Sequence, residues 1–165
     1  GVSFVGALLT KLNREPLGDR GAGRSYARAK RRVFEVTGLG YAVISVDDAY
    51  GRELLSDLDP MVQPVVYGVE SDCEGKHAKF VAGSGLTLTA KGIDFDVSTP
   101  WGDGHVHSSL LGAFNASNLL AALSVLLLMG VPVVDACKLV SALDTVPGRM
   151  ERFGDTASQP LVVVE

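Results

Sequence analysis

The stretch "YAVISVDDAYGRELLSDLDPMVQPVVYGVE", residues 41–70, decides the fold. Its first seven residues, 41–47, are apolar and β-branched, which is typical of a buried strand. The next segment, 47–58, starts with aspartate, a preferred residue at the start of a helix, and predicts a short helix. A second apolar run, 64–70, predicts another strand. Strand, helix and strand in this order indicate two parallel strands joined by a helical crossover.

Upstream of this unit the same pattern continues. Residues 3–10, "SFVGALLT", form a short apolar run that predicts another buried strand. Residues 11–23 are polar, rich in glycine and contain one proline, which predicts a loop. Residues 25–34, "SYARAKRRVF", have helical periodicity. The alternation of strands and helices therefore predicts an α/β fold, a parallel sheet with helices on its faces.

One basic side chain of the 25–34 helix is expected on its apolar face. At about 100° per residue, Tyr26, Val33 and Phe34 share one face, and the three arginines of the segment point away from it. Lys30 is four residues after Tyr26 and four before Phe34, inside the apolar stripe. The sequence alone favours a lysine whose stem lies along apolar surface while its ammonium stays in water.

Residues 77–111 change to an alternation of period two, broken by glycine-rich turns. Polar residues alternate with the apolar ones, which predicts an antiparallel β-meander with one face in water. The apolar residues expected on its buried face are Leu86, Leu88, Ala90, Ile93, Phe95 and Val97.

Two helices and a further strand are predicted after the meander. Residues 113–130 are apolar on most sides, which is typical of a helix packed on several sides. A glycine ends this helix, and a proline suits the first turn of a second helix over 131–144. The final run, "PLVVVE" (160–165), predicts a buried strand of the parallel type, the start of a further unit.

The composition is that of one globular domain. Of the 165 residues 47% are hydrophobic and 21% charged, and the net charge of −4 gives no reason to expect nucleic acid as a partner. The N-terminus has no signal-peptide pattern, and the most apolar run, 119–134, is shorter than the ~20 residues of a membrane span. We therefore expect a cytoplasmic protein without membrane contact. Cys73 and Cys137 form no C-x-x-C pair, which predicts reduced thiols.

Four stretches together resemble the Mur ligase family: "YARAKRRVF" (26–34), "LLGAFNASNLLAAL" (110–123), "VPGRMERFG" (146–154) and "PLVVVE" (160–165). These ATP-dependent enzymes add amino acids to the peptidoglycan precursor. The resemblance is greatest to the members that add the third residue, usually meso-diaminopimelate or lysine, to UDP-N-acetylmuramoyl-L-alanyl-D-glutamate. It implies that residues 1–149 are the C-terminal half of the central ATP-binding domain and that residues 150–165 begin the C-terminal domain.

The resemblance implies a catalytic and metal-binding role for Lys30. In this family the lysine at this position faces the active site and is carbamylated by CO₂. Desolvation lowers the pKa of a lysine and leaves more neutral amine to react. The carbamate is an anion whose oxygens suit Mg²⁺. The alternative is the solvated lysine described above.

The resemblance also implies nucleotide contacts. Asn115 and Asn118 lie three residues apart on one face at the start of the predicted helix. A carboxamide both donates and accepts hydrogen bonds, so it can read the edge of an adenine, and the alternative is helix capping. Asn115 resembles the adenine-contacting asparagine of the family, with Asn118 as the weaker candidate. Arg149 resembles a nucleotide-contacting arginine at the joint between domains, and the alternative is a salt bridge with Glu151.

His105 and His107 alternate on a predicted strand and so share a face, a spacing that metal ligands also use. No third ligand is evident nearby in the sequence. We therefore expect polar positions of a β-hairpin here and no metal site.

The loop over residues 10–21 departs from the family pattern. Pro16 stands where relatives have a Mg²⁺-binding histidine, and proline has no side-chain ligand atom. The carboxylates of Glu15 and Asp19 lie in the same loop, but nothing local in the sequence indicates that either replaces the histidine. The chain also contains no G-x-x-x-x-G-K-[ST] phosphate loop. We therefore expect the isolated chain to be inactive.

Three functions stay open from the sequence. The first is a fragment of an ATP-dependent amide ligase, with ATP and Mg²⁺ as cofactors and a UDP-muramoyl peptide as the substrate partner. The second is a degenerate, non-catalytic homologue, which Pro16 favours. The third is an interaction module that uses exposed sheet edges, and such edges also favour self-association.

Overall fold

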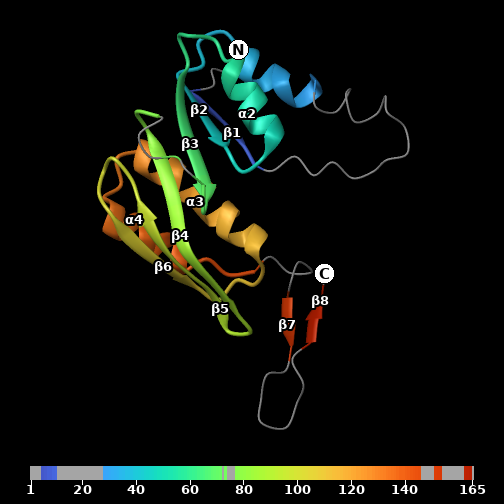
Figure 1. Cartoon of the computed structure of the whole chain (residues 1–165), viewed down its shortest axis with the longest axis vertical. Coiled ribbons are helices and arrows are strands. Elements are labelled where there is room, and N and C mark those ends of the chain that lie inside the picture. Colours follow the sequence, from blue (N-terminus) through green and yellow to red (C-terminus); the bar gives the residue numbers. More distant parts are fainter. Residues whose placement is uncertain are drawn as a thin grey trace, which may run out of the picture.

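A six-stranded sheet with strand order β1-β2-β3-β4-β5-β6 forms the main body of the protein (Figure 1). The computed structural model describes residues 5–10, 28–71, 73, 77–145, 151–153 and 162–164. The strands are β1 (Gly6–Leu9), β2 (Tyr41–Ser45), β3 (Gln63–Val69), β4 (Phe80–Thr89), β5 (Gly92–Ser98) and β6 (Gly104–Ser108). Strands β1 to β4 pair in parallel, and β4, β5 and β6 pair antiparallel. The predicted parallel sheet and antiparallel meander are thus confirmed, and they share β4.

Helices cover both faces of this sheet. Phe34 and the helix after β2 pack with Ala42 and Ile44 in one core cluster. Val43 points to the opposite face and packs with Leu120 in a larger cluster, as the period of two along a strand requires. The helical elements are a segment at 28–31, the 3₁₀ helix η1 (Arg32–Glu35), α2 (Ala49–Ser56), α3 (Ala113–Leu128) and α4 (Val133–Ser141).

The sequence of α2 explains where this helix begins and how closely it packs. An aspartate caps the helix, as predicted; the N-cap is Asp48, the second residue of the predicted segment, and it accepts a hydrogen bond from the backbone N–H of Tyr50 at 3.0 Å. Gly51 is buried against β2. A Cβ at this position would overlap the carbonyl oxygen of Ser45 and lie 3.3 Å from Cγ2 of Ile44. The helix reaches the strand this closely because position 51 has no side chain.

Three details of burial differ from the prediction, and one of them is Ala90, which was expected on the buried face of the meander but is exposed in the turn after β4. Phe34 is buried, but Val33, expected beside it, is 47% exposed. Residues 32–35 form a 3₁₀ helix, which turns about 120° per residue, so the apolar stripe shifts away from Val33. Leu88, expected on the buried face of the meander, is 50% exposed. It lies where β4 continues past β3, since β3 pairs with β4 only as far as Gly83.

A second, two-stranded sheet is formed by β7 (Glu151–Phe153) and β8 (Val162–Val164). The strand predicted over 160–165 is therefore present in its described residues. The prediction of a parallel-type strand was wrong, because β8 pairs antiparallel with β7. A short connection between two strands permits antiparallel pairing but not a parallel crossover.

Helix α4 covers the outer edge of β6. The backbone N–H of His107 donates a hydrogen bond to Oγ of Ser141 at 3.3 Å. Gly104 lies so close to α4 that a Cβ there would be 2.6 Å from Sγ of Cys137. The helix thus occupies the side on which another strand would pair. Self-association through sheet edges stays a prediction. Among the described strands of the main sheet, β1 and the part of β4 beyond Gly83 have a side without a strand partner.

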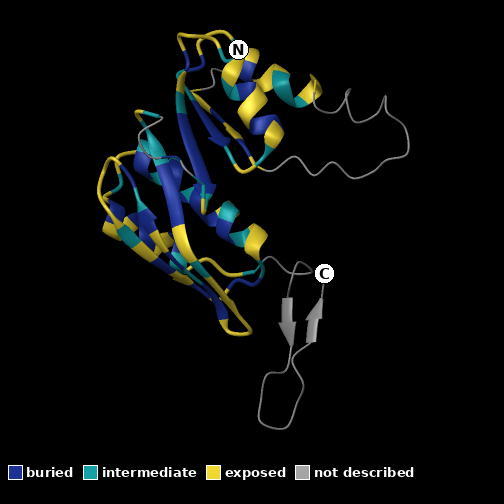
Figure 2. Cartoon of the chain, viewed as in Figure 1, coloured by how far each residue is buried: buried dark blue, intermediate teal, exposed yellow. Residues whose placement is uncertain are grey.

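Burial follows this layered arrangement (Figure 2). The strands in the middle of the sheet are dark blue, whereas the turn between β4 and β5 is yellow and exposed. None of the helices within the described residues combines the length and the hydropathy of a bilayer span.

Candidate functional site

Helix α3, which carries Asn115 and Asn118 near its start, begins at the carboxyl edge of the parallel strands (Figure 1). Strand β6 runs in the same direction as β4, because both pair antiparallel with β5. The last residue of β6, Ser108, pairs with Ile93 of β5, and Ile93 pairs with Leu88 of β4. Leu88 lies beyond Gly83, the last residue of β4 that pairs with β3, so the end of β6 lies past the carboxyl end of β3. Helix α3 starts shortly after Ser108 and therefore at this edge. Ligands of open α/β sheets bind outside the carboxyl ends of the strands.

Asn115 and Asn118 form a linked pair at the start of α3. Nδ2 of Asn115 donates to the carbonyl oxygen of Leu111 at 2.8 Å, and Nδ2 of Asn118 donates to Oδ1 of Asn115 at 3.2 Å. Gly112 is the N-cap residue, so neither asparagine has that role. Asn115 is partly buried, and both ends of its carboxamide are engaged. Asn118 is exposed, and its Oδ1 has no hydrogen-bond partner among the described residues.

Asp47 ties together the ends of β2 and β3 at the same edge. Its carboxylate accepts a hydrogen bond from the backbone N–H of Val69 at 2.9 Å and another from the hydroxyl of Ser71. Gly68 makes this approach possible, since a Cβ there would lie 2.6 Å from Oδ1 of Asp47. Glu70, which directly follows the last residue of β3, has a φ of 53°, a conformation that few non-glycine residues adopt. The Asp47 carboxylate therefore holds the loop that follows β3.

Lys30 lies in the helical segment 28–31 and is partly buried. The segment leads into η1, whose Phe34 belongs to the core cluster of β1, β2 and α2. Helix α3 packs on the other face of the sheet. The structure thus places Lys30 and the Asn115–Asn118 pair on helices that cover opposite faces. Five residues singled out from the sequence lie outside the described residues: Glu15, Pro16, Asp19, Tyr26 and Arg149.

The outer face of β5 and β6 carries a ladder of histidines and aspartates. Nδ1 of His105 is 2.8 Å from Oδ1 of Asp96, and its Nε2 is 3.0 Å from Oδ1 of Asp94. Nδ1 of His107 is 2.8 Å from Oδ2 of Asp94. The hydrogen bond to Asp96 is the main cause that raises the pKa of His105, and the hydrogen bond from His107 is the main cause that lowers the pKa of Asp94.

The described residues do not form a metal centre at this ladder or elsewhere. No group of three or more His, Cys, Asp or Glu side chains among them is arranged to hold a metal ion. The ring nitrogens of His105 that contact Asp94 and Asp96 donate both bonds only when the imidazole is protonated. The ladder is therefore a set of charge-assisted hydrogen bonds that link β5 to β6.

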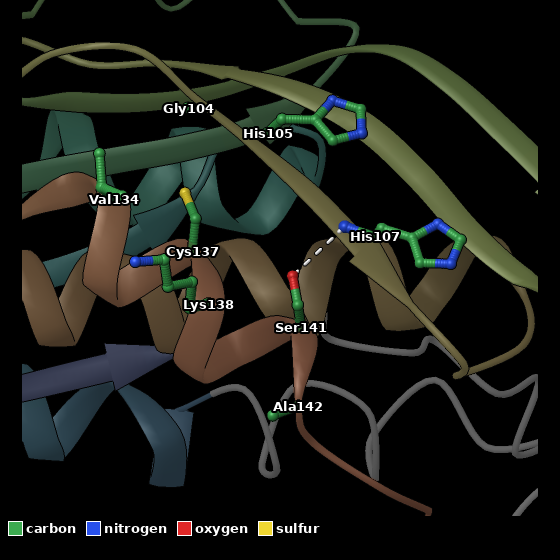
Figure 3. A pocket seen from close by; sticks show the side chains of 8 residues that line it. All are labelled: Gly104, His105, His107, Val134, Cys137, Lys138, Ser141 and Ala142. Atoms are coloured by element: carbon green, nitrogen blue, oxygen red, sulfur yellow. Dashed lines mark hydrogen bonds between the residues drawn. The ribbon is translucent and has the colours of Figure 1, made fainter.

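A pocket of about 540 Å³ lies between β6 and α4 (Figure 3). The imidazole rings of His105 and His107 point away from the α4 wall, and the dashed line marks the bond between His107 and Ser141. Burial raises the pKa of the Cys137 thiol in this wall. Neither Lys30 nor the asparagine pair lines the pocket. The lining residues are Gly104, His105, His107, Val134, Cys137, Lys138, Ser141 and Ala142.

Comparisons with known proteins identify the family. The family model for the Mur ligase middle domain matches residues 1–126. The chain is 39% identical to the UDP-N-acetylmuramoyl-L-alanyl-D-glutamate–2,6-diaminopimelate ligase of Chromobacterium violaceum over 166 residues, which cover 100% of this chain and 32% of the relative. The ligase of the same name from Coxiella burnetii is 37% identical over 165 residues, 100% of this chain and 33% of that protein. The chain thus spans about a third of the length of these relatives.

Solved structures share the fold. A structure of a UDP-N-acetylmuramoyl-L-alanyl-D-glutamate–2,6-diaminopimelate ligase superimposes with a TM-score of 0.74 at 28% identity, over 92% of this chain and 30% of that one. The pseudomurein peptide ligase type C of Methanothermus fervidus superimposes with a TM-score of 0.74 at 19% identity, over 98% of this chain and 38% of that one, which shows the fold alone. The α/β sheet, the matched family model and the identity to these ligases agree. The chain belongs to the Mur ligase family.

Proposed function

We propose that this chain is part of the ATP-binding middle domain of a ligase that adds the third amino acid to the UDP-N-acetylmuramoyl dipeptide in peptidoglycan synthesis. One observation carries the proposal: the whole chain aligns at 39% identity with the 2,6-diaminopimelate ligase of C. violaceum. The proposed amino acid is 2,6-diaminopimelate, after the names of the relatives. In the proposed reaction, ATP phosphorylates a carboxylate of the dipeptide, and the incoming amine then displaces phosphate.

The asparagine pair fits the adenine of ATP. Asn118 is exposed and keeps a carboxamide oxygen and a second N–H available to a ligand, so it can accept from and donate to a base edge. Asn115 holds Asn118 in place, because its Oδ1 accepts the other N–H and its own amide is fixed to Leu111. We therefore assign the base contact to Asn118 and a positioning role to Asn115. This division reverses the order of the two candidates that the sequence favoured.

Mg²⁺ does not fit the described residues by themselves, since they contain no group of carboxylates or histidines arranged as ligands. Lys30 stays the proposed site of a carbamate, and its partial burial supports a lysine that is not fully solvated. Incubation with ¹³C-bicarbonate tests this proposal. A carbamate resonance in the ¹³C spectrum that disappears in Lys30→Arg supports it, and an unchanged spectrum contradicts it.

The division of the chain is also a proposal. We propose that residues 1–149 belong to the middle domain and that residues 150–165 begin the next one, because β7 and β8 form a sheet separate from the main sheet. Arg149, at this boundary, is proposed to contact the nucleotide from the joint. The UDP-muramoyl peptide as substrate and the cytoplasmic location stay predictions.

A degenerate, non-catalytic homologue is the second candidate. Pro16, in place of a metal-binding histidine, favours this candidate, because proline has no side-chain ligand atom. The two candidates differ in one measurable property. A retained nucleotide site binds ATP, whereas a degenerate site does not.

Calorimetric titration of the chain with Mg-ATP separates them. We expect binding, and we expect Asn118→Ala to weaken it by roughly 2- to 10-fold, since one or two hydrogen bonds of about 0.5–1.5 kcal/mol are lost. Gln63→Ala is the matched control, because Gln63 is also an exposed amide but lies at the start of β3, at the other edge of the sheet. The absence of heat at millimolar ATP would contradict the ligase assignment of this site.

A further inference from the structure

Phe114 is an exposed aromatic side chain beside the asparagine pair. It lies in the first turn of α3, and 48% of it is exposed. Gly112, the residue before Ala113, has a φ of +86° and lies against the phenyl ring: a Cβ there would be 2.8 Å from Cε1 and 3.2 Å from Cδ1 of Phe114. The ring therefore rests on backbone that has no side chain. Glycine permits both the backbone conformation and the contact.

Phe114 lies on the same face of α3 as Asn118, the residue proposed to contact the base. Residues four apart on a helix are neighbours, so Phe114 and Asn118 share one face. At about 100° per residue, Asn118 lies between Phe114 and Asn115 around the helix axis. The three side chains therefore occupy neighbouring positions on one helix face, and this strip presents an exposed aromatic residue and an exposed carboxamide.

The chemistry of this strip suits a neutral, planar and polar-edged ligand. Helix α3 contains no charged residue, so the strip offers no partner to a phosphate or a carboxylate. An aromatic ring gives stacking area to any base, and a carboxamide adds hydrogen bonds to its edge. A purine has both features, whereas an aliphatic ligand has neither.

We propose that Phe114 is the platform on which the adenine of the bound nucleotide stacks while Asn118 contacts the edge of the base. The inference rests on the proposed nucleotide role of α3 and adds a residue that binds the base. Gly112 positions the ring, because a side chain there would displace it. Phe114 acts in binding and takes no part in the transfer of the phosphoryl group.

Titration with ADP followed by ¹H NMR tests the proposal, since weak binding is measurable and stacking leaves its own signature. We expect the adenine H2 and H8 resonances to move upfield on binding, through the ring current of Phe114. In Phe114→Ala the upfield shift disappears, and affinity falls by about 5- to 150-fold, the range measured for the loss of one base–aromatic stack. Phe114→Tyr keeps the ring and retains both the shift and the affinity. Far-UV circular dichroism confirms that each variant is folded.

Trp101→Leu is the matched control. Trp101 is also an exposed aromatic residue, 40% exposed, but it lies in the turn between β5 and β6, at the end of β6 opposite to the start of α3. Its replacement leaves ADP binding unchanged. Gly112→Ala weakens binding in the same direction as Phe114→Ala.

The outcomes separate this proposal from the one on which it rests. If ADP binds the wild type and Phe114→Ala binds equally well, the stacking role is wrong and the nucleotide site stands. If Phe114→Ala lowers the melting temperature without changing the adenine shifts, Phe114 has a packing role only, and the proposal is overturned. If ADP at millimolar concentration does not bind the wild type, both proposals fail.

Discussion

Gly51→Ala is the substitution for which the structure and helix propensity predict opposite signs. Alanine in the interior of a helix is more favourable than glycine by about 0.8–1.0 kcal/mol, so propensity alone predicts a gain in stability. In the structure, the new Cβ would overlap the carbonyl oxygen of Ser45 and lie 3.3 Å from Cγ2 of Ile44. Neither neighbour can move easily, because β2 pairs with β1 on one side and with β3 on the other.

The magnitude follows from these two effects. Overpacking a core by one methyl group costs about 1–3 kcal/mol, and a clash with fixed backbone belongs at the upper end of that range or above it. After the gain in propensity is subtracted, we expect a net loss of about 2 kcal/mol in the free energy of unfolding. For a chain of this length, that loss lowers the melting temperature by roughly 4–8 °C.

Thermal and urea unfolding followed by circular dichroism measure this loss. Glu53→Ala, at an exposed position of the same helix, is the control and changes the free energy of unfolding by no more than about 0.5 kcal/mol. A Gly51→Ala variant as stable as the wild type, or more stable, would refute the close contact between α2 and β2.

Three further predictions concern the core and the ladder. Leu120→Ala, at a fully buried position of α3, lowers the free energy of unfolding by about 2–5 kcal/mol in urea denaturation. Burial raises the pKa of Tyr67 to about 12, and its hydroxyl donates to the carbonyl oxygen of Leu9 at 3.0 Å. Tyr67→Phe therefore removes a tyrosine that ionises only near pH 12 in a titration at 295 nm and costs about 0.5–1.5 kcal/mol. In the ladder, the raised pKa of His105 gives stability that is complete below about pH 6.5 and is lost as pH rises through the folded-state pKa. The lowered pKa of Asp94 gives stability that is present above about pH 4 and is lost as pH falls through its folded-state pKa. The difference in melting temperature between the wild type and His105→Gln is thus largest between these limits and shrinks by pH 8.5, as thermal unfolding at several pH values will show.

Each of these has an outcome that contradicts it. Leu139→Ala, at an exposed position, is the control for Leu120→Ala, and equal losses in the two variants would contradict the assigned core. A complete tyrosine titration below pH 11 would contradict the burial of Tyr67. A gap between wild type and His105→Gln that widens with rising pH would reverse the sign assigned to the ladder.

Local patterns predicted the elements of the fold, because strands and helices leave their period in the sequence. The alternation in the meander placed Ile93, Phe95 and Val97 on the buried face, and all three are buried. The exposure of Leu88 and Val33 was not predictable in this way. It depends on how far β4 extends past its neighbour and on a switch from α-helix to 3₁₀ helix, and neither leaves a local signal.

In the candidate site, too, some features could be predicted from local sequence and others depend on the fold. Spacing predicted that Asn115 and Asn118 share a face, but which carboxamide is engaged depends on the carbonyl oxygen of Leu111, and only the fold reveals that contact. Phe114 escaped the sequence reasoning because an aromatic residue at the start of an apolar helix is expected in the core. The glycine two residues before it was the available signal, since glycine at a helix start permits a close contact.

The contact of α4 with the edge of β6 has a consequence for how the protein is made. Residues of β6 leave the ribosome before those of α4, since Ser108 precedes Val133 in the chain. During that interval the outer main-chain groups of His105 and His107 are open to any extended segment nearby, which is the state from which nascent sheets aggregate. Docking of Cys137 and Ser141 ends this interval. Helix α4 thus protects the edge of β6 from pairing with other chains. The time between the synthesis of β6 and the docking of α4 determines how long this edge is exposed.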